Sequence, residues 1–120
     1  MSMSYIEKTA AALGENLEPA VQRFGGNVEL YARFLKKFPQ DPTADALAEA
    51  VRQKNYPEVE RSAHTLKGVA ANLGLETLRA GSDALVQAVR RQSFQEVDSL
   101  YESFAAEYAR VKKKYLRDKK

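Results

Sequence analysis

Apolar residues recur at helical spacing along nearly the whole chain, and this periodicity constrains the fold more than any other feature. Within residues 28–38, one face of a helix with about 3.6 residues per turn would carry Val28, Tyr31, Phe34, Leu35 and Phe38. Alternating polar and apolar runs, which are typical of half-buried strands, do not occur in the sequence. The pattern therefore predicts an all-α chain.

Glycine, proline and capping residues mark where the predicted helices begin and end. Gly25 and Gly26 end one helix and Asn27 can cap the next, while Asp41 and Pro42 open another as a capping carboxylate and a first-turn proline. The predicted helices cover Tyr5–Leu13, Leu17–Phe24, Val28–Phe38, Asp41–Lys54, Pro57–Leu73, Leu75–Arg91 and Phe94 to about Arg117.

Two further signals lie in the second half of the chain. Gly74 suits the left-handed residue that follows a helix, and Ser93 with Glu96 three residues later forms a capping-box pattern before the last helix. Because the loops are short, we expect an antiparallel four-helix bundle with an additional short N-terminal helix or helices. The sequence leaves open whether helices 28–38 and 41–54 act as one bent element or whether one helix caps the bundle.

The length of 120 residues predicts a single domain over residues 1–120, with residues 1–16 as an extension or cap. The chain has no cysteine, which excludes disulfides, a thiolate nucleophile and cysteine-ligated metals. No segment resembles a signal peptide or is apolar enough to span a membrane. We therefore expect a soluble, cytoplasmic protein.

The net charge of +3 comes from a basic tail at residues 112–120, which holds six basic residues and one acid. Without this tail, 13 basic and 15 acidic residues remain, so the rest of the chain does not have the basic surface of a nucleic-acid-binding protein. We interpret the tail as a solvated helix end; a weak contact with an anionic surface is the alternative.

The strongest candidate for chemistry is His64, the only histidine. On a helical wheel it lies away from the apolar stripe that contains Val59, Leu66 and Leu73, so its imidazole should point to solvent. The residues near the same azimuth are Pro57, Glu60, Arg61, Lys67, Gly68, Ala71 and Leu75.

An exposed neutral imidazole is a nucleophile that can carry a phosphoryl group. Lys67 and Gly68 lie one helical turn after His64, where the ammonium can offset phosphoryl charge and the glycine leaves room for a partner. Mid-helix glycine otherwise costs up to about 1 kcal/mol relative to alanine. The simpler interpretation is an ordinary surface histidine, with Lys67 and Arg61 as solvated charges.

The flanking residues resemble the histidine-containing phosphotransfer (HPt) domain family, whose signature is approximately A-H-x-L-K-G followed by five residues and a glycine. The matching residues are Ala63, His64, Leu66, Lys67, Gly68 and Gly74. The resemblance covers about Glu18 to Arg91 and implies a four-helix bundle that relays phosphoryl groups between aspartates of receiver domains. It implies that His64 is the phosphoacceptor, that Lys67 steadies the phosphoryl group and that Gly68 leaves room for docking.

The chain also departs from relatives of this family. Val69 and Ala70 stand where many relatives carry small hydroxyl residues, and Val86 aligns with a glutamine that orients the histidine ring in some of them. Gln87 is one residue away and would face about 100° to the side in a regular helix. The residue that orients the His64 ring therefore stays open.

The face around His64 is the expected docking surface for receiver domains, with Glu60, Arg61, Ala71 and Leu75 as further members. We expect no cofactor or metal on this chain, because it has no carboxylate cluster with metal-ligand spacing; Mg²⁺ would come with the receiver. We also expect a monomer. The sequence does not tell a free-standing carrier from a domain of a hybrid histidine kinase.

The sequence argues against an enzyme and against a kinase. An enzyme with His64 as general base lacks a second histidine, a cysteine and a serine-elbow motif, and a kinase would need a glycine-rich phosphate loop that the chain does not have. We therefore expect no autonomous catalysis. The remaining alternative is a helical adaptor that binds a partner protein through the same face without phosphoryl transfer.

Overall fold

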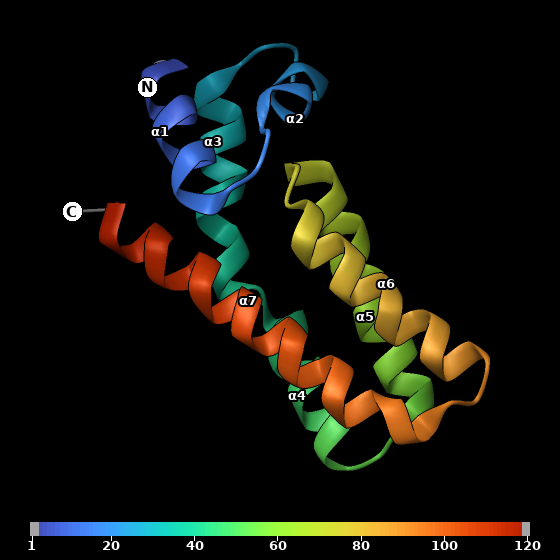
Figure 1. The fold of residues 1–120 in the computed structure, drawn as a ribbon. Helices are drawn as coiled ribbons and strands as arrows, with labels where there is room; N and C mark the ends of the chain where they lie inside the picture. The colour runs from blue at the N-terminus through green and yellow to red at the C-terminus, as the bar shows by residue number, and fades with distance from the viewer. Residues whose placement is uncertain (1–2, 119–120) are drawn as a thin grey trace.

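The computed structural model describes residues 3–118 and the side chains of residues 5–114, and it shows helices joined by short connections (Figure 1). No strand occurs within residues 3–118, so the all-α prediction is confirmed. Residues 119–120, the end of the predicted basic tail, lie outside the described residues. The elements are α1 (Met3–Leu13), α2 (Glu18–Arg23), α3 (Val28–Lys37), the 3₁₀ turn η1 (Phe38–Gln40), α4 (Pro42–Arg52), α5 (Tyr56–Leu73), α6 (Glu76–Arg90), the 3₁₀ turn η2 (Phe94–Glu96) and α7 (Val97–Asp118).

Helices α4, α5, α6 and α7 form the predicted antiparallel bundle (Figure 1). Each of them contacts the next, α7 also contacts α4, and α5 packs most extensively against α6. Figure 1 shows α3 continuing through η1 into α4, so the two helices left open by the sequence form one bent column. Helices α1 and α2 lie at the same end of the molecule as α3.

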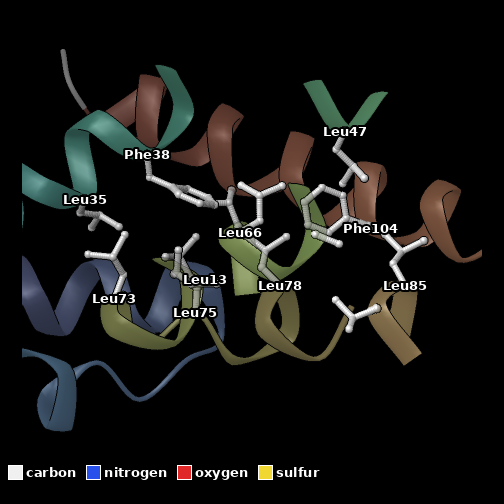
Figure 2. Packing of buried hydrophobic residues seen from close by; sticks show 14 of the residues in the cluster. Leu13, Leu35, Phe38, Leu47, Leu66, Leu73, Leu75, Leu78, Leu85 and Phe104 are labelled. Carbon is white, nitrogen blue, oxygen red and sulfur yellow. The ribbon is translucent and has the colours of Figure 1, made fainter. Parts of the chain in front are cut away.

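The core is built from the apolar stripes of the four bundle helices. Leu47 of α4, Leu66 of α5, Leu85 of α6 and Phe104 of α7 come together in one region of the core (Figure 2). The leucines are fully buried and Phe104 nearly so. Burial of such side chains stabilises the fold by about 1.5–3 kcal/mol each, so this layer fixes how the helices face one another.

The local signals for helix ends are confirmed at most positions. The Asn27 side chain accepts a hydrogen bond from the Leu30 N–H at 3.0 Å, and the Asp41 carboxylate accepts one from the Thr43 N–H at 2.8 Å. Gly74 has a φ of +78°, the left-handed conformation expected after a helix.

The prediction of a capping box before the last helix is wrong. Ser93 precedes the turn η2, and its side chain makes no capping hydrogen bond. The Ser93 N–H donates to the Ala88 carbonyl at 2.8 Å, and the Glu96 carboxylate forms an ion pair with Arg91 at 3.3 Å. Helix α7 therefore begins only at Val97, after a full 3₁₀ turn.

The C-terminal end of α5 is held by side chains from the N-terminal helices. The buried Tyr31 hydroxyl of α3 donates a hydrogen bond to the Leu73 carbonyl at 2.6 Å. The Arg23 guanidinium of α2 donates to the carbonyls of Ala71 and Asn72, at 2.5 and 3.3 Å. These bonds satisfy carbonyls that every helix end leaves without partners inside the helix. The N-terminal helices thereby stabilise the helix that carries His64.

Candidate functional site

Helix α5 presents His64 near its middle. The helix begins after Asn55, whose side chain accepts from the Glu58 N–H at 3.4 Å, and it ends at the left-handed Gly74. Its core face, which includes Ala63 and Leu66, is fully buried. His64 is exposed, as the helical wheel predicts. A regular helix anchored at both ends therefore fixes the backbone beneath the imidazole.

Lys67, one turn after His64, is engaged by a carboxylate from the neighbouring helix. Its Nζ lies 3.0 Å from Oδ1 of Asp83 on α6, and the two side chains are 32% and 33% exposed. The Gln87 amide donates to the same Oδ1 at 3.3 Å. These hydrogen bonds, the one from Lys67 first, lower the pKa of the Asp83 carboxyl below its usual value.

The register between α5 and α6 explains why the His64 ring has no hydrogen-bonding partner among the described side chains of α6. Glu60 pairs with Arg90 at 2.9 Å, and Lys67 pairs with Asp83 at 3.0 Å. Between these two pairs, both helices advance by seven residues in opposite directions along the chain, so the register is the same at each pair. The position level with His64 on α6 is therefore Val86, which is fully buried. Val86 is also the residue that the resemblance to the HPt family places where some relatives carry a glutamine.

No side chain among residues 5–114 forms a hydrogen bond with the His64 ring. Gln87, the nearest polar alternative in the sequence, directs its amide to Asp83. Within the described part of the chain, the ring is thus left free to be oriented by a group from outside.

A groove of about 1050 Å³ runs along one side of the ring, between α5 and the bent column of α3, η1 and α4. We call it the His64 groove. Phe34 of α3 is 46% exposed there, and Lys37 holds its ammonium 5.8 Å from the centre of the Phe34 ring. The residues that line the groove are Phe34, Lys37, Phe38, Gln40, Asp41, Pro42, His64, Thr65, Gly68, Val69, Asn72 and Leu73.

Gly68 forms part of the floor of this groove. A Cβ at this position would have no atom within 4 Å from outside its own helical neighbourhood, so no internal packing contact requires a glycine. The φ of Gly68 does not lie in the left-handed region either. What the missing side chain provides is open space beside His64.

A smaller hollow of about 250 Å³ lies on the other side of the ring and is charged. Glu60, Arg61 and Arg90 line it, with Arg90 paired to Glu60 and Arg61 paired to Glu58 at 3.0 Å. His64 lines both hollows. The ring therefore lies between a mainly apolar groove and a charged depression.

The docking residues expected from the sequence are only partly brought together. Glu60 and Arg61 lie beside His64, whereas Ala71 is half-buried and lines neither hollow. The prediction that Leu75 is a docking residue is wrong, because its side chain is fully buried in the core. Gly74 ends α5 in the left-handed conformation, so the helical wheel of α5 does not extend to Leu75, which precedes α6 as its N-cap residue.

Sequence reasoning missed several residues around the ring. Phe34 was assigned to the buried stripe of residues 28–38 but lies in the His64 groove with Val69. Asp83 was missed because its role depends on the register of α6 against α5. The only local signal was its spacing of four residues from Gln87, which allows a hydrogen bond on one helix face.

The described residues contain no group of three or more histidine, cysteine, aspartate or glutamate side chains that could hold a metal ion. Within residues 3–118, no helix combines the length and the apolar character that a membrane crossing requires.

Comparison with known proteins supplies one match. The family model described as Hpt domain matches residues 29–114, which is more than half of the chain and runs from α3 into α7. No curated protein and no solved structure gives a match. The chain therefore belongs to the Hpt domain family, whose members are phosphorelay carriers, rather than kinases, in two-component signal transduction.

Proposed function

We propose that His64 accepts a phosphoryl group from the aspartate of one receiver domain and passes it to the aspartate of another. The observation that supports this most directly is an exposed imidazole in the middle of an anchored helix, with a lysine one turn away and open space at Gly68. An acceptor needs this combination of reach, positive charge and access, because its partner must bring the reacting phosphorus to the ring.

The proposed step exchanges one bond to phosphorus for another. The unprotonated imidazole nitrogen of His64 attacks the phosphorus of the receiver's acyl phosphate, a nitrogen–phosphorus bond forms, and the bond to the aspartate oxygen breaks. The aspartate leaves as a carboxylate, and the second ring nitrogen keeps its proton. Transfer to the next receiver is the same step in reverse, so the chain ends unmodified.

Most of the charge stabilisation is assigned to the partner. A divalent cation in the receiver's acidic pocket would neutralise the phosphoryl oxygens during transfer. Lys67 would contribute a mobile point charge after the group has arrived. The His64 groove, with Phe34 and Val69 on its walls, would accommodate the receiver surface that surrounds its aspartate.

Transfer of a labelled phosphoryl group tests the proposal. The protein is incubated with a phosphorylated receiver domain, and the expected label is stable to alkali and labile to acid, as a phosphohistidine is. His64→Gln should abolish the label while circular dichroism stays unchanged. Glu49→Gln, which removes a surface carboxylate on α4 that lines neither hollow, is the control and should keep the label.

Two results would contradict the proposal. Label that persists in His64→Gln would assign the acceptor to another side chain. A wild-type protein that binds receivers but never becomes labelled would be the helical adaptor considered above. A cytoplasmic location, a monomeric state and the lack of autonomous catalysis stay predictions.

A further inference from the structure

The three cations of α5 and α6 that lie nearest His64 in sequence or share its charged hollow, Arg61, Lys67 and Arg90, each have a carboxylate partner among residues 5–114. Arg61 pairs with Glu58 at 3.0 Å and Arg90 pairs with Glu60 at 2.9 Å, with the arginine side chains 76% and 51% exposed. Lys67 differs in its setting, because its side chain is only 32% exposed. Charges that are shielded from water are less screened, so we expect the ammonium of Lys67 to be the least screened of these three cations.

Lys67 has its ammonium within reach of two groups, the His64 ring on its own helix and the Asp83 carboxylate on α6. Its spacing of three residues from His64 places it next to the ring along α5, while its ammonium points across to Asp83 on α6. A lysine has a flexible four-carbon stem and three rotatable donors, so it can change partners without any movement of the backbone. Asp83 and a group carried by His64 would therefore compete for one ammonium.

The charges favour a change of partner when the ring is phosphorylated. A protein-bound phosphoryl group carries about −1.5 to −2 charges at pH 7, whereas the Asp83 carboxylate carries one. Asp83 would not be left without a donor, because the Gln87 amide already bonds to the same oxygen at 3.3 Å. The cost of releasing Lys67 is thereby reduced.

We propose that Asp83 is a positioning residue that holds Lys67 away from the unmodified His64 ring and releases it to the phosphoryl group. This inference rests on the proposed function and deepens it. The carrier then binds its phosphoryl group less tightly than Lys67 alone would allow, because each phosphorylation must first break the pair with Asp83. Asp83 thus sets the balance between retention of the group and its release to the next receiver.

The test compares equilibrium constants for phosphoryl transfer from one phosphorylated receiver domain to the wild-type protein and its variants. Asp83→Asn keeps the shape of the side chain and removes its charge. It should raise the equilibrium constant about 2- to 5-fold, the range expected for a partly exposed ion pair. Asp83→Glu should restore a value near wild type, and Glu49→Gln, the control with equal loss of charge on α4, should not change it.

The same substitution made in a Lys67→Ala protein distinguishes two effects of Asp83. One acts through Lys67, and the other is a direct effect of the Asp83 charge on the phosphoryl group. In Lys67→Ala, Asp83→Asn should leave the equilibrium constant unchanged, because the residue through which it acts is gone. An increase that persists in this background would overturn the inference. An Asp83→Asn equilibrium constant equal to wild type would also overturn it.

Measurement of the Asp83 titration by NMR tests the pair in the unphosphorylated protein. The pKa of this carboxyl should lie below its usual value and should rise in Lys67→Ala, and an unchanged pKa would refute the resting contact. Failure of the inference is distinguishable from failure of the proposed function. If the wild-type protein takes no label, both fail; if it takes label and the variants do not differ, only the inference fails.

Discussion

The substitution Gly68→Ala separates the folding of α5 from access to His64. Gly68 lies inside a helix, is exposed, and would place a Cβ in open space. Replacement of a helical glycine by alanine should therefore stabilise the protein, by about 0.5–1 kcal/mol. With an unfolding entropy of about 2.1 cal/mol/K per residue over 120 residues, the melting temperature should rise by about 2–4 °C.

The same methyl group should impair phosphoryl transfer. It would project into the His64 groove, next to the ring that a receiver must approach. An extra methyl at a closely packed contact costs about 1–3 kcal/mol. If the receiver packs against Gly68, kcat/KM for transfer should fall by about 5- to 150-fold.

Thermal unfolding by circular dichroism and kcat/KM from single-turnover transfer are measured on the same preparations. Gly81→Ala is the matched control, because Gly81 is also inside a helix and its added Cβ would meet Phe104 at 3.7 Å, an ordinary contact. This control should not lose stability and should transfer at the wild-type rate. A destabilised Gly68→Ala, or one with an unchanged rate, would refute the reasoning.

Three other predictions concern the fold around the site. Leu75→Ala should cost about 2–5 kcal/mol of unfolding free energy in denaturant titrations, since Leu75 is a core residue; a loss of receiver affinity without loss of stability would contradict this. Tyr31→Phe should cost about 1–3 kcal/mol in the same assay, because it leaves the Leu73 carbonyl without its donor. Burial raises the pKa of Tyr31, so the folded protein keeps a proton that the unfolded chain loses, and stability should fall as pH rises above about 10. This alkaline decline should be shallower in Tyr31→Phe, and equal slopes would argue against it.

Features that depend on a few neighbouring residues could be predicted from the sequence. Asn27, Asp41 and Gly74 each act within one turn of chain, and the structure has them in the expected roles. Ser93 and Glu96 have the same kind of pattern, yet it fails there. There the Ser93 N–H donates to the carbonyl of Ala88 in the preceding helix, and the Glu96 carboxylate pairs with Arg91, which lies outside the capping motif.

Features that depend on how two helices lie against each other could not be predicted in this way. The exposure of His64 follows from the helical period of α5 alone, whereas the contact between Lys67 and Asp83 requires the register of α6. Phe34 belongs to an apolar stripe by its spacing, but it is exposed and lines the groove between α5 and the α3–η1–α4 column. Leu75 fails because one residue beyond a left-handed glycine already belongs to the next element.

No side chain among residues 5–114 holds the His64 ring by a hydrogen bond. For a carrier, this freedom of the ring has a kinetic consequence. A ring that is not fixed beforehand loses rotational freedom when a partner's active site orients it. Immobilising such a side chain costs about 0.5–1.5 kcal/mol. That loss lowers the affinity of every complex that the ring enters. Because affinity differences between related complexes lie mostly in the dissociation rate, we expect faster dissociation. Each encounter is thereby shortened, which favours a protein that must leave one receiver before it can meet the next.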